Sequence, residues 1–335
     1  QYKIKLFTLL SSSINKIFRI NNDKEFNAIA LEVFKFQYEN NQVYNAYVNV
    51  HRSNISEIKH YSEIPFLPIQ FFKSHDVICD SSSITKTFLS SGTSLSKRSK
   101  HHVTDLDIYG SSFQKGFRKF YGEPKDWVIL ALLPSYLDQG DSSLIYMVDQ
   151  LMKQSKNKES RYLNATSTQT ENTIEKLKNK KVLLIGVSFA LLDLAEKTLP
   201  SLKKWTIMET GGMKGRRKEM VREELHDILK YKFDVDTIHS EYGMTELLSQ
   251  AYSLQNGLFN CPSWMKVMVR DLEDPFRLVD NESSGGLNII DLANVHSCSF
   301  IETQDIGKKH SNGKFEILGR FDNSEIRGCN LLSIS

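Results

Sequence analysis

The chain has 335 residues, of which 40% are hydrophobic and 25% are charged, and its formal net charge is +3. This composition is ordinary for a globular protein, and a net charge this small argues against nucleic acid or an anionic membrane as the partner. No apolar run approaches the roughly 20 residues that a membrane span needs. The length predicts one large domain or two smaller ones.

The cysteines indicate a reducing compartment. Cys79, Cys261, Cys298 and Cys329 form no C-x-x-C pair and no metal-ligand spacing. We therefore expect free thiols and a cytoplasmic protein. The first ten residues contain a short apolar core without a cleavage-like end, and we predict no signal peptide there.

Residues 1–75 are predicted to form a helical arm. Asp23 is a suitable N-cap, and the apolar residues from Phe26 to Phe34 recur at the spacing that lines one face of a helix. Two prolines within residues 64–69 interrupt any helix there. We expect the arm to pack on the main domain. The proline segment could also line a pocket for an acyl or aryl group, although core packing is the simpler explanation.

A hydroxyl-rich turn follows a strand predicted over residues 84–89. The turn consists of Ser90, Ser91, Gly92, Thr93 and Ser94. Backbone N–H groups in such a turn form an anion-binding concavity, hydroxyls add donors, and Lys97 begins a cationic stretch beside it. The spacing of a P-loop is absent. The turn therefore indicates either a phosphate site of another kind or a solvated loop with a basic edge.

Strands and helices alternate through the middle of the chain. A helix is predicted over residues 104–120, directly after the hydroxyl-rich turn. Continuous apolar runs at 127–134, 182–188 and 205–209 predict buried strands. A loop and a helix follow the first and the third, and a helix over 189–199 directly follows the second. This order is typical of an α/β fold with a parallel or mixed sheet. Ligands in such sheets bind beyond the carboxyl ends of the strands, so the loops after these strands are candidate sites.

A glycine-rich turn follows the third of these strands. Gly211, Gly212 and Gly215 would let the backbone approach a flat ligand closely. Arg216 and Arg217 come next, at the predicted start of a helix, where cations oppose the helix dipole. They make more sense facing an anion, although a flexible turn with a basic edge is the simpler alternative.

Residues 238–250 are predicted to form a further strand, turn and helix. Tyr242 offers a face for stacking, and Thr245 and Glu246 offer a hydroxyl and a carboxylate at the helix start. A carboxylate near bound phosphates usually holds Mg²⁺, whereas the simpler alternative is a capped helix. The remaining chain is rich in strands at 264–270, 286–292 and 313–318, which predicts a smaller antiparallel β-subdomain from about residue 260.

Taken in order, these passages resemble the adenylate-forming superfamily of acyl and aryl ligases. Residues 90–97 are similar to its phosphate loop, 241–246 match its Y-G-x-T-E motif, and 319–322 match its G-R-x-D hinge motif. Asp305 stands where the superfamily has its ribose-binding acid. The passages 133–137, 142–147 and 209–217 point to the LuxE-type acyl-protein synthetases within it.

The resemblance implies a fold and a division of the chain. The fold is α/β: the large N-terminal domain of the ligase fold, with mixed sheets and a smaller β-subdomain, lacking the usual C-terminal domain. The helical arm covers residues 1–75, the adenylate-forming domain covers 76–320, and a tail over 321–335 carries Cys329.

The resemblance also implies a site that binds ATP and Mg²⁺. The residues that would hold the phosphates are Ser90, Ser91, Gly92, Thr93, Ser94 and Lys97. The residues that would contact adenine are Gly211, Gly212, Tyr242 and Gly243. Thr245 would face the α-phosphate and Glu246 would bind Mg²⁺. Asp305 and Arg320 would fix the ribose.

The implied activity is activation of a carboxylic acid to an acyl-adenylate, with Lys97 and Thr245 assisting. Cys329 would then accept the acyl group as a thioester and pass it to a partner such as an acyl reductase. Nearby Arg327 favours the thiolate, although an inert tail cysteine is the alternative. The composition suits a fatty or an aryl acid equally. The same adenylation would serve an acyl- or aryl-CoA or carrier-protein ligase, and a non-catalytic nucleotide-binding module is a third possibility.

Overall fold

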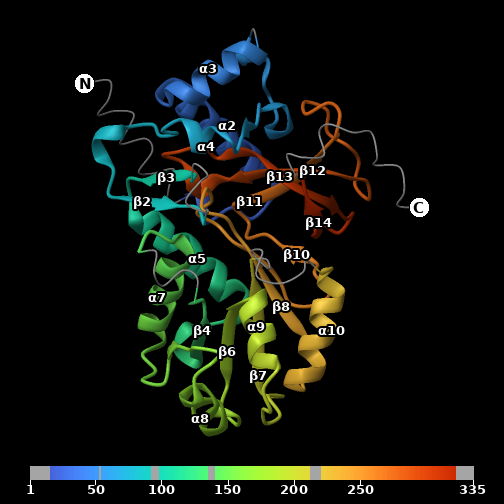
Figure 1. Cartoon of the computed structure of the whole chain (residues 1–335). Coiled ribbons are helices and arrows are strands. Elements are labelled where there is room, and N and C mark those ends of the chain that lie inside the picture. Colours follow the sequence, from blue (N-terminus) through green and yellow to red (C-terminus); the bar gives the residue numbers. More distant parts are fainter. Residues whose placement is uncertain (1–15, 53, 92–97, 135–139, 212–219, 322–335) are drawn as a thin grey trace.

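The computed structural model describes residues 16–52, 54–91, 98–134, 140–211 and 220–321 (Figure 1). Within these ranges the chain forms one 12-stranded mixed sheet and a separate two-stranded hairpin, with helices packed around them. The strand order is β11-β12-β13-β14-β10-β9-β8-β7-β6-β4-β5, and β1 (Leu67–Pro68) pairs with β13. In the same ranges, no helix is both long and apolar enough to cross a membrane.

Five strands that run in the same direction form the parallel half of the sheet. They are β4 (Val128–Leu132), β5 (Arg161–Tyr162), β6 (Val182–Val187), β7 (Trp205–Thr210) and β8 (Ile238–Tyr242). Every residue of β4 and β6 is buried, as expected for strands covered on both faces. The three buried strands predicted from apolar runs are confirmed, and so is the α/β class.

Helices connect these strands and cover the parallel half. They are α7 (Ser143–Ser155), α8 (Thr168–Leu177), α9 (Ser188–Ala195) and α10 (Arg222–Phe233). In Figure 1, α7 and α10 flank the parallel strands on opposite sides and α8 lies at the bottom. Glu223 and Glu224 lie in the first turn of α10, where acidic side chains complement the helix dipole. The predicted basic helix start at Arg216 and Arg217 lies outside the described residues.

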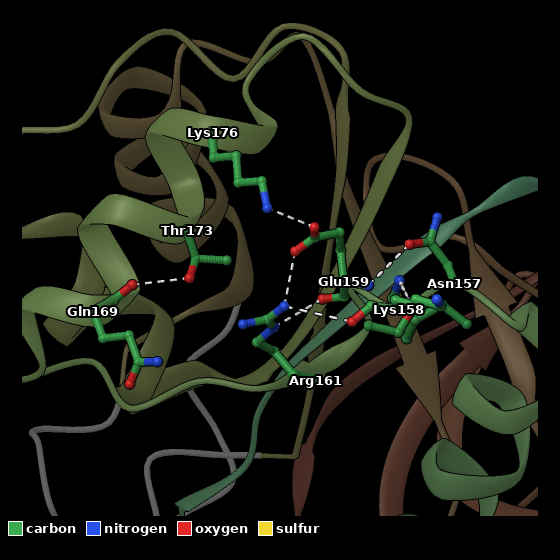
Figure 2. Close-up of polar contacts among 9 residues, drawn as sticks. Asn157, Lys158, Glu159, Arg161, Gln169, Thr173 and Lys176 are labelled. Atoms are coloured by element: carbon green, nitrogen blue, oxygen red, sulfur yellow. Dashed lines mark hydrogen bonds and ion pairs between the residues drawn. The ribbon is translucent and has the colours of Figure 1, made fainter.

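The short edge strand β5 is tied to α8 by a carboxylate between two cations. Glu159 Oε2 lies 2.8 Å from Arg161 Nη2 and Glu159 Oε1 lies 2.6 Å from Lys176 Nζ, as Figure 2 shows. These side chains are partly exposed, so solvent and salt screen the pairs and their contribution to stability is small. Charged side chains at a sheet edge oppose pairing with another chain.

Antiparallel strands continue the same sheet beyond β8. They are β9 (Ala251–Ser253), β10 (Phe259–Asn260), β11 (Met265–Arg270), β12 (Ser284–Asp291), β13 (Phe300–Lys309) and β14 (Phe315–Arg320). The pairing of β10 with both β9 and β14 joins this half to the parallel half. The strands predicted at 264–270, 286–292 and 313–318 are confirmed within a few residues.

The N-terminal helices pack on the antiparallel half. The other helices and 3-10 turns of the described chain are α2 (Asp23–Asn40), α3 (Gln42–His51), Ile55–Glu57, Tyr61–Glu63, α4 (Phe71–Ser74), Ser81–Ser83, α5 (Leu106–Tyr121), Pro124–Asp126 and Leu292–Asn294. The N-cap of α2 is Asn22 rather than the predicted Asp23, because the Asn22 side chain accepts the Glu25 N–H. Gln37 Nε2 donates to the carbonyls of Asn294 and Val295, which anchors α2 beside β12.

Near the site, the strand predicted over 84–89 and the helix predicted over 104–120 are confirmed, but one strand was not predicted and the helix predicted after Tyr242 is wrong. A strand, β3 (Lys100–Val103), precedes helix α5 (Leu106–Tyr121) and pairs with β2 (Lys86–Leu89) as a hairpin. The helix predicted after Tyr242 does not form: residues 243–250, all within the described chain, make turns that lead into β9. The physical reason is that buried side chains take backbone groups that a helix would pair internally, as the site shows.

Candidate functional site

The carboxyl ends of the parallel strands bring several of the predicted site residues to one edge of the sheet. In the parallel pairing, Val187 of β6 lies opposite Thr210 of β7, and Thr210 lies opposite Glu241 of β8. The next residues along the chain are Ser188, Gly211 and Tyr242. This edge is where ligands bind in open α/β sheets, so the topology alone marks it as the candidate site.

The predicted phosphate turn, residues 90–97, comes between β2 and β3 in the chain, and the structure describes only Ser90 and Ser91 of it. Ser90 closes the base of the turn: its N–H donates to Ser99 O at 3.0 Å, and its Oγ accepts the Ser99 N–H at 2.8 Å. Arg98 Nε donates to Ser90 O at 2.5 Å. Ser91 is exposed. Four other residues predicted for this loop lie outside the described residues: Gly92, Thr93, Ser94 and Lys97.

Tyr242, Asp305 and Arg320 form one cluster, and the strand register accounts for it. Asp305 of β13 lies opposite Arg320 of β14, and Arg320 Nε is 3.8 Å from Asp305 Oδ1. The Tyr242 hydroxyl, at the end of β8, donates to Asp305 Oδ2 at 2.7 Å. Burial raises the pKa of Asp305, while the Tyr242 hydrogen bond and the Arg320 charge act in the opposite direction.

The ring of Tyr242 is packed rather than open. It is 8% exposed and makes edge-on contacts with Phe259 and Phe315, with ring centroids 5.9 Å and 5.7 Å away. Its predicted role of stacking on adenine stays a prediction. Arg320, by contrast, has a side chain that is 66% exposed, which leaves most of its guanidinium available to a ligand.

Glu246 connects the hairpin with the turn after β8. Burial raises the pKa of its carboxyl, and a hydrogen bond from the Ser99 side chain and the charges of Arg320 and Lys73 oppose that effect. Ser99 also binds Ser90, and His101 of the same hairpin lies 2.7 Å from Thr245 O, so Ser90 and Glu246 lie on neighbouring segments. Within the described residues, no group of three or more His, Cys, Asp or Glu is arranged to hold a metal ion.

Residues 245–249, called the Thr245 loop below, are held in place by three buried side chains that sequence reasoning missed. Asp291 accepts the N–H groups of Leu248 and Ser249 at 2.8 and 2.9 Å, and the Ser249 hydroxyl at 2.5 Å. Asn294 Nδ2 donates to Glu246 O at 2.8 Å. His101 Nδ1 lies 2.7 Å from Thr245 O. The three side chains lie 42 or more residues away along the chain from the groups they bind, so no local pattern could have indicated them.

Two glycines in the site have steric reasons to be glycine. Gly211 follows β7 with a φ of +69°, a conformation that side chains disfavour, and its carbonyl accepts the Ser188 hydroxyl at 3.0 Å. At Gly243 an added Cβ would lie 2.5 Å from Glu241 Oε1. The predicted Gly212 lies outside the described residues.

Two buried acids at the ends of β7 and β8 were also not predicted. Glu209 lies 3.2 Å from Arg222 Nε and 3.6 Å from His226 Nε2; burial opposes its ionisation, but these partners lower its pKa overall. Burial raises the pKa of Glu241 to about 7, with a smaller contribution from the Glu209 charge. Thr210 Oγ1 donates to Glu241 Oε2 at 2.5 Å, which partly offsets the cost of burial.

No family model matches the chain, and no curated protein matches it. Solved structures do match. ATP-bound MatB from Rhodopseudomonas palustris is 16% identical with a TM-score of 0.53, and the match covers 72% of this chain and 49% of MatB. The 2-hydroxyisobutyryl-CoA ligase in its postadenylation state, in complex with R3-HIB-AMP, is 13% identical with a TM-score of 0.66, covering 90% of this chain and 68% of the ligase.

This chain therefore spans about half the length of MatB and about two thirds of the 2-hydroxyisobutyryl-CoA ligase. At such low identity the likeness concerns the fold. The described residues have the mixed α/β fold of the large domain of adenylate-forming ligases, as the sequence predicted.

Proposed function

We propose that this chain activates a carboxylic acid with ATP, forming an acyl-adenylate and releasing pyrophosphate. The observation that carries the proposal is the convergence of Tyr242, Asp305, Arg320 and Glu246 at one edge of a ligase-type sheet. A buried acid beside an exposed guanidinium suits a ribose and a phosphate together. The ATP and AMP conjugates in the structurally similar proteins support the same assignment.

In this proposal each predicted residue has a part in holding the nucleotide. The phosphate turn binds the phosphates through Ser90, Ser91, Gly92, Thr93, Ser94 and Lys97. Gly211, Gly212, Tyr242 and Gly243 contact adenine. Asp305 and Arg320 fix the ribose, and Thr245 faces the α-phosphate.

Glu246 suits a magnesium ion bound to the nucleotide. It is a single buried carboxylate, and Mg²⁺ is commonly bound by one or two carboxylates together with substrate phosphates and water. A bound Mg²⁺ would neutralise phosphate charge. Burial raises the pKa of Glu246 overall, although the charges of Arg320 and Lys73 oppose it, and a bound Mg²⁺ would further favour the ionised carboxylate that such a site requires.

In this reaction the substrate carboxylate is the nucleophile, so the protein needs only to position the reactants and stabilise charge. A carboxylate oxygen of the acid attacks the α-phosphorus, the bond between that phosphorus and the bridging oxygen of the β-phosphate breaks, and pyrophosphate leaves. Lys97, Arg320 and the backbone N–H groups of the turn stabilise the charge on the phosphates. The protein holds the two reactants in line, which removes much of the entropic barrier.

The resemblance to LuxE-type proteins supports a finer proposal. The acid is a long-chain fatty acid, and the Cys329 thiolate attacks the acyl-adenylate carbonyl so that AMP leaves and a thioester forms. A partner such as an acyl reductase then takes the acyl group. Cys329 lies outside the described residues, so this step rests on the sequence alone.

An acyl-CoA ligase is the second candidate. The observation that favours it is that the structurally similar 2-hydroxyisobutyryl-CoA ligase has been seen in complex with both 2-HIB-AMP and CoA. In this case the thiol of coenzyme A, not Cys329, attacks the acyl-adenylate.

Pyrophosphate release across a panel of fatty, aryl and short-chain acids tests the adenylation. At least one acid should support release, and Asp305→Ala should abolish most of it, whereas Asp280→Ala, which removes an exposed acid, should not. Absence of release with every acid would mean that the fold serves nucleotide binding without catalysis.

The acyl acceptor is tested with labelled acid. Hydroxylamine-sensitive label on the protein that is lost in Cys329→Ser supports the acyl-protein synthetase. Equal labelling of the variant contradicts the role of Cys329. Release that depends on coenzyme A, without stable labelling of the protein, selects the second candidate.

A further inference from the structure

The pairing of β13 with β12 is interrupted beside Asp305. The pairs on either side of the interruption are Glu302 with Asn288 and Ile306 with Gly286. Residues 303–305 therefore lie opposite Leu287 alone, where a regular antiparallel pairing would place a single residue. A bulge of this kind bends the strand and turns a side chain in a new direction, and such bulges are common next to active sites.

Thr303 joins the two strands across the bulge. Its Oγ1 donates to Leu287 O at 2.8 Å and accepts the Asp305 N–H at 3.1 Å. One hydroxyl thus links β12 to the backbone of Asp305, where a regular pairing would use backbone groups alone. Thr303 is buried, so the groups that it binds have no water as an alternative partner.

Arg270 closes the bulge from β11, across β12. It lies opposite Gly286, and a Cβ added to that glycine would lie 2.4 Å from Arg270 Cζ, so the guanidinium crosses β12 because Gly286 has no side chain. Its Nη2 donates to Thr303 O at 2.7 Å and its Nη1 donates to Leu287 O at 2.9 Å. Glu302 Oε1, 3.6 Å from Nη2, balances part of the buried charge. The Leu287 carbonyl therefore accepts both Arg270 and Thr303.

The carboxylate of Asp305 has a partner at each oxygen. Oδ2 accepts the Tyr242 hydroxyl at 2.7 Å, and Oδ1 lies 3.8 Å from Arg320 Nε. The side chain of Asp305 is 17% exposed, so part of the carboxylate faces solvent. Since an ionised carboxylate can accept about four hydrogen bonds, acceptor positions remain for the hydroxyl groups of a ligand.

We propose that Thr303 and Arg270 are positioning residues, which hold Asp305 so that the free acceptors of its carboxylate meet the two hydroxyl groups of a ribose. This inference rests on the proposed function and extends it to two residues that touch neither the nucleotide nor the reacting atoms. Without the Thr303 hydroxyl, the Asp305 N–H loses its acceptor inside the bulge. The strand would then relax toward another pairing, and the carboxylate would move away from the ribose.

The test measures how strongly the site distinguishes a ribose from a sugar without hydroxyl groups. Isothermal titration calorimetry gives the dissociation constants of AMP and of 2′,3′-dideoxy-AMP, which carry the same base and phosphate. The wild type should bind AMP about 10- to 100-fold more tightly, as expected for hydrogen bonds to a charged acceptor. Thr303→Val removes the hydroxyl at similar volume and should lower this ratio by about 3- to 10-fold, through weaker binding of AMP alone.

Thr170→Val is the matched control. Thr170 and Thr303 are both 2% exposed, and the Thr170 hydroxyl also donates to a backbone carbonyl, that of Asn164, at 2.7 Å. Thr170 lies on α8, so its substitution should leave the ratio unchanged. Thr303→Ser, which keeps the hydroxyl, should restore the wild-type ratio. Thr303→Ala carries the same test if Thr303→Val does not fold.

Two further variants test whether the effect passes through Asp305. Arg270→Lys keeps the charge but loses the planar fork that reaches two carbonyls, so it should lower the ratio as Thr303→Val does. In a protein that already carries Asp305→Ala, Thr303→Val should lower the ratio no further. A further drop in that double variant would mean that Thr303 acts on the ligand by another route and would overturn the proposal.

Equal losses of AMP and dideoxy-AMP affinity in Thr303→Val would show a general structural role and overturn the positioning proposal. An unchanged ratio in Thr303→Val would overturn it as well, and so would a wild type that binds both nucleotides equally well. A wild type that binds neither nucleotide would instead contradict the proposed function itself, so the two failures are distinguishable.

Discussion

The Thr245 loop and the cluster of Tyr242, Asp305 and Arg320, which we call the ribose cluster after its proposed ligand, lie at the same edge of the sheet but are built in different ways. In the ribose cluster, the pairing of β13 with β14 sets Asp305 opposite Arg320, and β8 ends at Tyr242. In the loop, the backbone is held by side chains that come from β3, from the end of β12 and from the 3-10 turn after it. The position of a site residue on a strand should therefore change little when its neighbours are substituted, except where the pairing is interrupted, as it is between Leu287 and Asp305. The position of a residue on the loop should depend on side chains that are distant in the sequence.

Two buried carboxylates, one in each region, differ in the number of hydrogen-bond donors that they accept. Asp291 supports the loop and accepts three backbone N–H groups and one hydroxyl. Glu241, at the end of β8, accepts the Thr210 hydroxyl. Burial raises the pKa of both acids, but many donors offset it for Asp291 and few do so for Glu241. Removing the carboxylate should thus lower the stability of the protein at Asp291 and raise it at Glu241.

The largest effect is expected for Asp291→Ala. The variant leaves the N–H groups of Leu248 and Ser249 buried without an acceptor, and each such group costs about 1–3 kcal/mol. The free energy of unfolding, measured by denaturant titration, should fall by about 3–5 kcal/mol. The exposed Asp236→Ala is the control and should change it by less than about 0.5 kcal/mol. A loss below about 1 kcal/mol would mean that the loop does not depend on this carboxylate.

Glu241→Gln should increase the free energy of unfolding at alkaline pH, whereas Asp291→Ala should decrease it. The folded-state pKa of Glu241 is raised to about 7, above the ordinary value of 4.5, so the folded protein keeps a proton that the unfolded chain releases between these two values. The stability of the wild type should therefore fall as the pH rises through this window, by up to about 3 kcal/mol. The neutral amide can still accept the Thr210 hydrogen bond, so Glu241→Gln should lack this decline and exceed the wild type in stability at pH 8.

Unfolding measured at pH 5 and at pH 8 checks this expectation. Equal pH dependence of the wild type and Glu241→Gln would show that the carboxyl of Glu241 is already ionised in the folded protein at pH 5. A variant less stable than the wild type at pH 8 would show that partners stabilise the charge of Glu241 in the folded protein.

Tyr242→Phe tests the ribose cluster with a smaller effect. The change removes the hydroxyl that donates to Asp305 Oδ2 and keeps the packed ring. Hydrogen bonds to charged groups contribute about 1.5–3 kcal/mol, so AMP affinity should fall by roughly tenfold or more. Calorimetric titration with AMP gives the value. Tyr252→Phe, which alters another buried tyrosine, is the control and should leave AMP affinity unchanged.

The same contrast explains how far the sequence could predict this protein. Strands β4, β6 and β7 were predicted because strands buried on both faces need continuous apolar runs, and such runs are visible locally. Asp305 and Arg320 were identified by motif, and the structure places them opposite one another, although their roles stay predictions. Strand β3 was missed because Lys100 and the two histidines after it lack the composition of a strand.

The support of the Thr245 loop could not be predicted for a different reason. The order of strand, turn and capping residues predicted a helix after Tyr242, but His101 and Asn294 lie 144 and 48 residues from the groups that they hold. A contact between a side chain and a distant backbone group has no period in the sequence. The fold brings such groups together only after the sheet has formed, and the local preference for a helix is then overridden.

The smallest effect on stability is expected at Gly243, two residues before the Thr245 loop. An added Cβ would lie 2.5 Å from Glu241 Oε1, so Gly243→Ala must move a buried carboxylate that is itself bound to Thr210. Overpacking of this kind typically costs about 1–3 kcal/mol, and the end of a flexible side chain should keep the loss near the lower limit. Gly319→Ala is the matched control, because an added Cβ there meets no atom within 4 Å. Thermal unfolding should show a lower melting temperature for Gly243→Ala alone, and combining it with Glu241→Ala should remove the difference. If the loss persists in the double variant, the glycine is needed for the course of the backbone into the Thr245 loop rather than for the space that Glu241 occupies.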